Sequence, residues 1–202
     1  MPNEPTKQKN VTALILAGGR GLRMQGQDKG LISLWGEPLI EHVLGRVAPQ
    51  AGATVISANR NSETYVRYGY PVLADAIGRE WGPLAGIFTA LEFVNTAYLL
   101  VVPCDTPCLP VDLCRRLLDA LETGDADVAL AHDGDRAQFT VCLIRCSLAS
   151  GLRAYLESGE RRVESWLRQQ RLVEVPFTGV TNAFINVNSS EDLATLERKG
   201  GC

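Results

Sequence analysis

A Gly-rich, basic stretch that directly follows an apolar run is the feature that most constrains this chain. Residues 11–17 are apolar except for Thr12 and show no polar alternation, which is typical of a strand buried on both faces of a parallel sheet. Gly18 and Gly19 follow at once, and glycine lets the backbone adopt positive φ and approach a ligand closely. Successive backbone N–H groups in such a turn form a concave anion-binding site.

Three cations add full positive charge to this loop. Arg20, Arg23 and Lys29 follow the buried strand, so the loop is predicted to bind phosphates. Two familiar phosphate motifs do not fit it. A P-loop requires Gly-Lys-Ser/Thr, but Gly30 follows Lys29, and only the G-x-G part of the dinucleotide fingerprint is present, in residues 19–21. A flexible loop with solvated cations is the alternative.

The length of 202 residues favours one α/β domain, and 46% hydrophobic with 21% charged residues is typical of globular proteins. The net charge of −3 argues against general attraction to nucleic acid or to an anionic membrane. No apolar run reaches the roughly 18 residues of a membrane-spanning helix. Residues 1–10 are polar and lack the apolar segment of a secretory signal, so we expect a disordered N-terminus and a cytoplasmic protein.

The order of apolar runs predicts the architecture. Strand-like runs alternate with helix-like periodicity over the first part of the chain, which predicts a three-layer, doubly wound α/β fold with a mostly parallel sheet. We expect a single domain over residues 11–202. Residues up to about 110 form the half with the phosphate loop, and residues from about 111 form the acceptor side of a cleft. Residues 139–144 are expected to form an antiparallel strand and residues 183–187 a short strand.

Asp105 lies just beyond residues 97–102, the most hydrophobic strand-like run, where a carboxylate has no role in the core. Mg²⁺ takes oxygen ligands and commonly binds one or two carboxylates together with substrate phosphates. Because ligands of open α/β sheets bind beyond the carboxyl ends of the strands, the position favours metal binding. The alternative is an Asp that caps a helix expected to begin at Pro110.

Two further segments follow strand-like runs. Asp75 could be a second acidic group or an acceptor for a base or ribose, and a turn-forming Asp is the alternative. The segment Gly82-Pro83-Leu84-Ala85-Gly86 can bring backbone N–H and C=O groups against a flat ligand. Simple helix initiation explains its spacing equally well.

The second half of the chain offers polar candidates. Arg161 belongs to Gly159-Glu160-Arg161-Arg162, where adjacent arginines can grip a phosphate or planar ring, or be solvated in a turn. Asn186 and Asn188 share one face of the expected strand, within reach of a polar ligand, unless they are turn or cap residues. With two histidines and no Ser-His-Asp arrangement, the chain suits phosphoryl or nucleotidyl transfer, in which positioning and charge neutralisation dominate.

The six cysteines include two pairs with C-x3-C spacing, at positions 104/108 and 142/146. Structural zinc is one interpretation, but no C-x2-C spacing and no nearby His completes a ligand set. We expect buried free thiols in a reducing compartment instead.

A series of segments closely resembles the molybdenum cofactor guanylyltransferases, also called molybdopterin-guanine dinucleotide synthases, of the nucleotidyltransferase superfamily. The segments are Leu16-Ala17-Gly18-Gly19, Arg23-Met24, Asp28-Lys29-Gly30, Ala58-Asn59-Arg60, Gly82-Pro83-Leu84-Ala85-Gly86, Pro103-Cys104-Asp105-Thr106-Pro107, Gly159-Glu160-Arg161-Arg162-Val163 and Asn186-Val187-Asn188. They cover nearly the whole chain. The resemblance implies a Rossmann-like nucleotidyltransferase fold, Mg²⁺ as cofactor, and a nucleotide-binding half followed by an acceptor half.

The same resemblance implies roles for individual residues. Arg23 and Lys29 neutralise the phosphates of GTP, and Asp105 binds Mg²⁺; these three are the expected catalytic residues. Relatives often carry Asn-Ala-Asn-Arg where this chain has Ser57-Ala58-Asn59-Arg60, so Ser57 offers a hydroxyl in place of an amide. The residues expected to contact the substrates are Leu16, Ala17, Gly18, Gly19, Lys29, Ser57, Asn59, Asp75, Gly82, Gly86 and Asp105 for the nucleotide, and Arg161, Asn186 and Asn188 for molybdopterin.

The implied reaction is in-line attack by a molybdopterin phosphate oxygen on the α-phosphorus of GTP, with pyrophosphate leaving and no covalent enzyme intermediate. The implied partners are other proteins of molybdenum cofactor synthesis and target molybdoenzymes or their chaperones. Cytidylyl transfer to molybdopterin and nucleotidyl transfer to a sugar phosphate are alternatives within the same class. A non-catalytic protein that delivers nucleotide or cofactor is the alternative from a different class.

Overall fold

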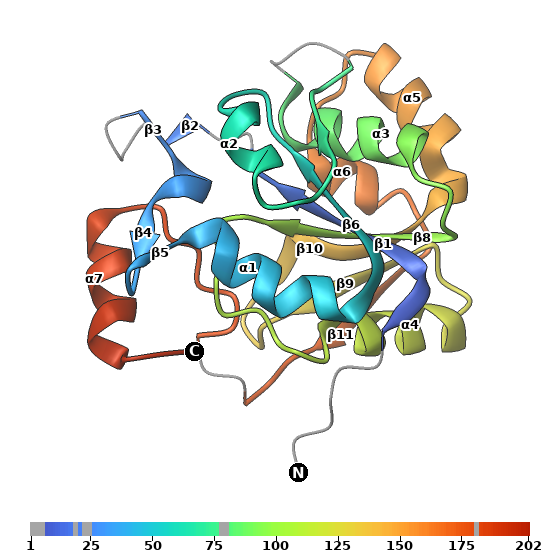
Figure 1. Ribbon diagram of the computed structural model, residues 1–202. Helices are drawn as coiled ribbons and strands as arrows, with labels where there is room; N and C mark the ends of the chain where they lie inside the picture. The colour runs from blue at the N-terminus through green and yellow to red at the C-terminus, as the bar shows by residue number, and fades with distance from the viewer. Residues whose placement is uncertain (1–6, 18–19, 22–25, 77–80, 180–181) are drawn as a thin grey trace.

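A seven-stranded sheet runs through the protein, and helices cover both of its faces (Figure 1). The computed structural model describes residues 7–17, 20–21, 26–76, 81–179 and 182–202. The strand order is β11-β9-β10-β8-β1-β6-β7. The strands of this sheet are β1 (Gln8–Leu16), β6 (Ala51–Ser57), β7 (Val72–Leu73), β8 (Tyr98–Pro103), β9 (Val128–His132), β10 (Ala137–Arg145) and β11 (Leu172–Pro176).

Smaller elements complete the described part of the chain. Two short hairpins pair β2 (Arg20–Gly21) with β3 (Gln27–Asp28) and β4 (Ser33–Leu34) with β5 (Glu37–Pro38). The α-helices are α1 (Leu39–Val47), α2 (Ser62–Val66), α3 (Pro83–Phe93), α4 (Leu113–Thr123), α5 (Ala149–Glu157), α6 (Val163–Leu167) and α7 (Ser190–Lys199). Short 3-10 helices cover Lys29–Leu31, Ala48–Gln50 and Cys146–Leu148.

The sheet is mostly parallel, as the sequence predicts. Strand β10 runs antiparallel to both β8 and β9, which confirms the antiparallel strand expected at residues 139–144. The remaining neighbours pair in parallel. A parallel sheet covered on both faces gives the three-layer, doubly wound architecture.

Alternation along the inner strands divides the core into two layers. Tyr98, Leu100 and Val102 of β8 pack on one face with α1 and α4. Leu99 and Val101 pack on the other face with α3, α5 and α6. Because β8 is buried on both faces, its sequence is continuously apolar rather than alternating.

Helix α7 packs outside the sheet, beside the β4–β5 hairpin (Figure 1). Leu196 of α7 and Val187 join a small apolar cluster with Ile32 and Leu34. The Ser189 side chain accepts a hydrogen bond from the Asp192 backbone, and the Asp192 side chain accepts one from the Ser189 backbone. This reciprocal cap holds the start of α7, so the chain just before it has a defined position.

Two expected boundaries differ from the structure. Strand β1 begins at Gln8, so residues 8–10 are ordered, contrary to the disordered N-terminus expected over residues 1–10. The prediction of a short strand at residues 183–187 is wrong, because this segment has no regular secondary structure. Its backbone instead follows the Asp105 loop, where the Val187 N–H donates to the Asp105 carbonyl at 2.8 Å. Among the described helices, none is both long and apolar enough to cross a membrane.

A disulfide corrects the expectation of six free thiols. Cys108 and Cys202 are bonded, with their Cα atoms 5.0 Å apart, although 94 positions separate them in the chain. The prediction was wrong for this pair because local spacing says nothing about a pairing made by the tertiary fold. The free cysteines are Cys104, Cys114, Cys142 and Cys146. Burial raises the pKa of Cys114 and Cys142 to about 12 and that of Cys146 to about 11, so these thiols are protonated at neutral pH.

Candidate active site

Three strand ends meet at one edge of the sheet. Leu16 at the end of β1 is in register with Ser57 of β6 on one side and with Pro103 of β8 on the other. The ladder continues one residue further, because Ala17 N–H donates to the Ser57 carbonyl and Cys104 N–H to the Leu16 carbonyl. Since the chain leaves β1 toward β6 and later returns to β8 on its other side, a topological switch point lies here, where open α/β sheets bind ligands.

Lys29 and Asp105 meet at this edge. The Lys29 Nζ donates to Asp105 Oδ2 at 2.9 Å and also to the Asn188 side-chain oxygen. Both partners are largely buried, with side-chain exposures of 18% and 13%. One cation thus joins the phosphate loop, the end of β8 and the C-terminal segment, three parts of the chain that the sequence singled out separately.

Asn186 is held beside the same loop. Its side-chain oxygen accepts a hydrogen bond from the hydroxyl of Thr106, the residue that follows Asp105. Asn186 and Asn188 therefore both contact the site, although their expected strand does not form. Thr106 is fully buried and was given no role by the sequence, because a lone Thr in a turn carries no distinctive signal.

Asp28 anchors the loop through its buried carboxylate. Its carboxylate accepts hydrogen bonds from Gly30 N–H at 3.2 Å, from the Asn61 side chain at 3.0 Å and from the Tyr65 hydroxyl. Burial first, and the hydrogen bond to Asp28 next, raise the pKa of Tyr65, so the phenol stays a donor. Asp28 is 9% exposed and precedes Lys29, so it fixes the backbone that carries the lysine. The sequence placed Asp28 in a motif without a role.

A second polar cluster lies on the other side of β1, at the end of β6. The Asn59 amide donates to Asp75 Oδ2 at 2.6 Å, and the Asp75 N–H donates back to the Asn59 side-chain oxygen at 2.9 Å. The Ser57 hydroxyl donates to Asp75 Oδ1 at a longer 3.4 Å. These three predicted residues are therefore neighbours, and they present amide, hydroxyl and carboxylate groups together.

Gly86 fits closely beside this cluster. A Cβ at Gly86 would lie 2.6 Å from the Ser57 hydroxyl and 3.0 Å from the Leu16 side chain, so only glycine lets α3 approach the strand ends. Gly82 precedes α3 with a φ of 61°, a conformation that favours glycine. Both glycines of the Gly82–Gly86 segment thus have a backbone reason for their identity.

Arg161 packs on Trp81, the residue before Gly82. Its guanidinium carbon is 3.9 Å from the ring centroid of Trp81, and its Nη1 donates to the carbonyls of Leu156 and Glu160. No contact described in the structure brings it to Asn186 or Asn188, with which the resemblance groups it. Its place on the molybdopterin side stays a prediction.

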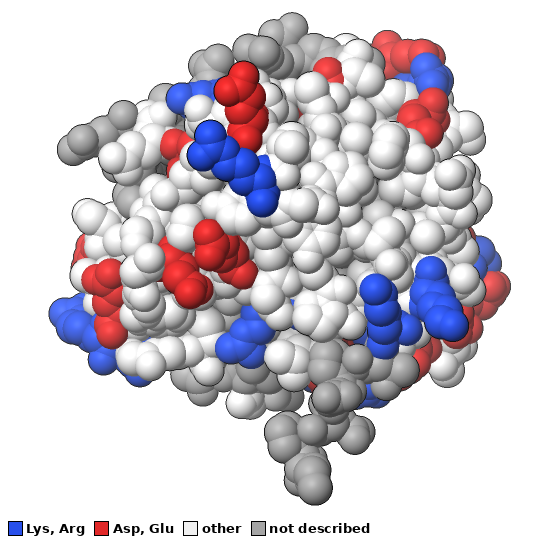
Figure 2. All heavy atoms as spheres, viewed as in Figure 1, with Lys and Arg blue, Asp and Glu red and all other residues white. Residues whose placement is uncertain are grey.

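Part of the predicted site lies outside the described residues. Gly18, Gly19 and Arg23 are not described, and only the backbone of Arg20 is. On the face that α1 and α2 cover, charged side chains of both signs occur in small groups without an extended patch of one sign (Figure 2). That face therefore offers no broad basic surface to an anion, as the net charge of −3 suggests.

The arrangement defines a nucleotidyltransferase: a doubly wound sheet whose switch point brings together a phosphate loop, a lysine and an aspartate. The MobA-like NTP transferase domain matches residues 13–175. Two curated relatives are molybdenum cofactor guanylyltransferases, from Shewanella loihica at 45% identity (92% of this chain, 95% of the relative) and from Shewanella sp. strain ANA-3 at 46% (92% and 94%). The chain belongs to the MobA-like NTP transferases and, within them, to the molybdenum cofactor guanylyltransferase family.

Solved structures share the fold. The molybdopterin-guanine dinucleotide biosynthesis protein A from Archaeoglobus fulgidus is similar with a TM-score of 0.77 at 24% identity, covering 93% of this chain and 97% of that one. The 4-diphosphocytidyl-2C-methyl-D-erythritol synthase from Anaerococcus prevotii has a TM-score of 0.72 at 14% identity, with coverages of 94% and 95%. At these identities the likeness establishes the nucleotidyltransferase fold alone.

Proposed function

We propose that this chain transfers GMP from GTP to the phosphate of molybdopterin, forming molybdopterin guanine dinucleotide and releasing pyrophosphate. The observation that carries the proposal is the contact of Lys29 with both Asp105 and Asn188, because it joins the phosphate loop to the acceptor half at one point. Membership of the guanylyltransferase family supplies the substrate class.

The nucleotide binds along the ends of β1 and β6 in this proposal. The backbone of Leu16, Ala17, Gly18 and Gly19 contacts base and ribose. The cluster of Ser57, Asn59 and Asp75 offers polar groups to the nucleotide, and the close packing at Gly86 shapes the wall toward α3. Gly82 borders the base.

The phosphates lie toward Lys29 and Arg23, whose positive charges neutralise them. Asp105 would hold Mg²⁺, because its largely buried carboxylate is a hard oxygen donor at the switch point. When bound, the ion shares phosphate charge with Lys29, as in other phosphoryl transfers. Lys29 is already within hydrogen-bond distance of Asp105, so a short side-chain movement lets it donate to a phosphate oxygen instead.

The reaction is an in-line displacement. A phosphate oxygen of molybdopterin forms the new bond to the α-phosphorus of GTP, and the bond from that phosphorus to the bridging oxygen of pyrophosphate breaks with its electron pair. The reaction requires no nucleophilic side chain. Lys29, Asn186 and Asn188 accelerate it by holding the two phosphates in position for the displacement.

The first test is calorimetric binding of GTP, CTP and ATP with Mg²⁺ to the wild type and to Asp105→Ala, together with pyrophosphate release on adding molybdopterin. We expect GTP-selective binding, and we expect Asp105→Ala to abolish transfer and the Mg²⁺ dependence of binding. Asp119→Ala is the matched control, because Asp119 lies exposed on α4. Tighter binding of CTP than of GTP would show that the chain transfers a cytidylyl group instead. Nucleotide binding without release of pyrophosphate would show that the chain is a delivery protein.

The proposal also includes a cellular setting. The names of the curated relatives support a place in molybdenum cofactor synthesis. The chain would then work in the cytoplasm with proteins that supply molybdopterin and with target molybdoenzymes or their chaperones. Co-purification with such proteins, lost on mutation of an exposed patch, tests this part separately.

A further inference from the structure

The segment at the start of α2, residues 61–65, reaches the phosphate loop. The Tyr65 hydroxyl donates to Asp28 Oδ1, and the Asn61 side chain donates to Asp28 Oδ2 at 3.0 Å. Each carboxylate oxygen of Asp28 therefore has a partner from a segment 33 to 37 positions further along the chain. The part of the loop that carries Lys29 is thus tied to a different strand–helix unit of the fold.

The identity of Gly30 shows how closely Tyr65 approaches the loop. A Cβ at Gly30 would lie 2.5 Å from the Tyr65 hydroxyl and 3.4 Å from the Cys104 Sγ. Gly30 directly follows Lys29, and Cys104 directly precedes Asp105. The tyrosine hydroxyl therefore lies where the two backbone segments that carry the Lys29–Asp105 pair come together.

Asn61 directs its amide to the loop rather than to its own helix. It precedes α2 with a φ of 51°, a left-handed conformation that Asn adopts more readily than most residues. An Asn just before a helix commonly accepts a hydrogen bond from the first turn, but this side chain makes no such cap. Its amide donates to Asp28 and so stabilises the loop instead of the start of α2.

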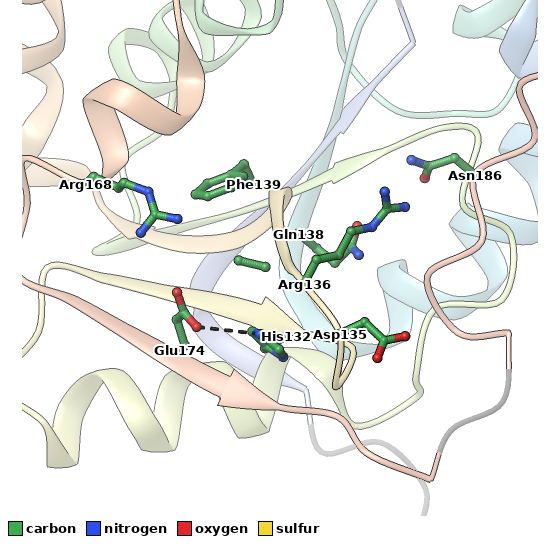
Figure 3. Close-up of a pocket in the computed structure, with 9 residues that line it drawn as sticks. His132, Asp135, Arg136, Gln138, Phe139, Arg168, Glu174 and Asn186 are labelled. Atoms are coloured by element: carbon green, nitrogen blue, oxygen red, sulfur yellow. Dashed lines mark ion pairs between the residues drawn. The ribbon is translucent and has the colours of Figure 1, made fainter.

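Tyr65 is fully buried, so it cannot contact a substrate. The open cavity in Figure 3 lies beside β9, β10 and β11, on the other side of β1 from the strands that flank α2 in the chain, and none of its described lining residues belongs to α2. An effect of Tyr65 on the reaction therefore has to pass through the residues that it holds. Among these, Asp28 is the neighbour of Lys29.

The proposed reaction depends on the exact place of Lys29. Its ammonium has to be aligned with a phosphate while the new bond forms, and a misplacement of about 1 Å can lower a rate about a hundredfold. A displaced ammonium still attracts the phosphates, because the attraction between charges falls off slowly with distance. Loosening of Asp28 should therefore reduce the rate of transfer more than the affinity for GTP.

We propose that Tyr65 and Asn61 are positioning residues for the guanylyl transfer, which hold the Asp28 carboxylate and thereby the backbone that places Lys29 against Asp105. The inference rests on the proposed function, and it deepens that function by assigning a role to a segment outside the phosphate loop. Lys29 is then in place before GTP arrives, so binding of GTP does not have to order this part of the loop.

Kinetics and lysine NMR, measured separately, test the inference. Pyrophosphate release from GTP, Mg²⁺ and molybdopterin gives kcat and KM. The NMR signal of the Lys29 ammonium nitrogen, identified by its absence from Lys29→Ala, reports the surroundings of this group without turnover. We expect Tyr65→Phe to lower kcat about tenfold, to change the KM for GTP less than about twofold and to shift the Lys29 signal.

Asn61→Gly tests the same inference without a change in the core, because Asn61 is exposed. Glycine keeps the positive φ and removes only the amide, so we expect a smaller decrease in kcat and a smaller shift of the Lys29 signal. Tyr68→Phe is the matched control, because Tyr68 also interacts with a carboxylate, that of Glu41 on α1. We expect it to leave kcat and the Lys29 signal unchanged.

A double variant shows whether Tyr65 acts through Lys29. Tyr65→Phe is introduced into Lys29→Ala, and the kcat values of the two single variants and the double variant are compared with that of the wild type. We expect no further decrease in kcat in the double variant, because the group that Tyr65 positions is already absent. A general weakening of the fold would instead lower kcat by the same factor with and without Lys29.

The outcomes separate the inference from the proposed function. With an active wild type, an unchanged kcat or an unchanged Lys29 signal in Tyr65→Phe overturns the inference, and so does an equal decrease in kcat with and without Lys29. A shifted Lys29 signal in Tyr65→Phe and Asn61→Gly supports the positioning of Lys29 even if the wild type forms no dinucleotide, and the proposed function alone then fails. Urea unfolding of each variant checks that folded protein is measured.

Discussion

The Lys29 ammonium donates to the Asp105 carboxylate at 2.9 Å, although 76 positions separate the two residues. Lys29 is fixed in place by its neighbour Asp28, which the backbone of Gly30 and the side chains of Asn61 and Tyr65 hold. Asp105 is fixed by the end of β8, in register with β1. The backbone that carries each partner is therefore fixed, for Lys29 by the contacts of Asp28 and for Asp105 by the end of β8. The pair sets the distance between the phosphate loop and the proposed metal ligand.

Replacing Lys29 by Ala removes the positive charge at this centre. We expect both GTP affinity and the rate of pyrophosphate release to fall, each by about tenfold or more, because a charge-assisted hydrogen bond to phosphate is lost. Lys9→Ala serves as control, since Lys9 is an exposed lysine near the opposite end of β1. Unchanged nucleotide affinity in Lys29→Ala would instead assign this lysine to the acceptor.

Gly86 and Gly45 form a matched pair of helical glycines. In Gly86→Ala the new Cβ would lie 2.6 Å from the Ser57 hydroxyl, so either the Ser57 side chain or α3 must shift, and we expect a loss of about 1–3 kcal/mol in unfolding free energy together with weaker GTP binding. In Gly45→Ala nothing lies within 4 Å of the Cβ, and we expect a gain of about 0.5–1 kcal/mol with unchanged binding. Urea unfolding and calorimetry measure both. Equal effects of the two substitutions would contradict the close approach at Gly86.

The Cys108–Cys202 disulfide predicts a redox-dependent stability. Titration of denatured protein should give four thiols before reduction and six afterwards. Because the bond closes a long loop of 94 residues, Cys202→Ser should lower the unfolding free energy by about 4.7 kcal/mol in the chain-entropy model.

A reductant provides the control for that prediction. It should destabilise the wild type by a similar amount and leave Cys202→Ser unaffected, since Cys202 is exposed and Ser brings no other change. Six free thiols in the purified, unreduced protein would show that the bond does not form in solution.

Asp127 predicts a pH-dependent contribution to stability. The hydrogen bonds from Arg171 above all, and the charges of Arg171 and Arg145, lower the pKa of Asp127 in the folded protein. Arg171 Nε and Nη2 each lie 2.8 Å from its carboxylate and join the starts of β9 and β11. A lowered folded pKa contributes stability that is present above the unfolded value of about 3.9 and is lost as the pH falls through the folded value.

The corresponding measurement is the melting temperature of wild type and Asp127→Asn between pH 7 and pH 3. We expect the variant to melt lower at pH 7 and the difference to shrink steadily below about pH 4. Asp119→Asn is the control, because Asp119 is exposed on α4. A difference independent of pH would mean that Asp127 acts through packing rather than charge.

Local sequence determined the elements that carry the site. The continuous apolar runs of β1 and β8 identified strands buried on both faces, and the polar residues just after them identified the ligand-binding edge, because parallel strands end together. Lys29, Asp105 and Asp75 were predicted as site residues in this way, from the Gly-rich loop and from the strand ends, whereas Asn59 was predicted from the family resemblance. The antiparallel β10 was also expected, from the less regular alternation of residues 139–144.

Other features could not be predicted from the sequence, because they depend on contacts between segments that are distant in the chain. The stretch at 183–187 has strand-like composition, yet it docks on the Asp105 loop through Val187 and Asn186 instead of joining the sheet. Arg161 was grouped with the asparagines by motif, whereas its described contact is with Trp81. Spacing along the chain contains no information about such pairings.

The sequence by itself thus determined the fold class and the strands whose ends form the candidate site, because hydrophobic periodicity and glycine placement act over a few residues. The tertiary structure alone decided that Lys29 joins Asp105 and Asn188, that Asp28 anchors the loop and that Cys108 bonds Cys202. Each of these relationships brings together residues far apart in the chain, and only the packing of the completed sheet fixes the distances between them.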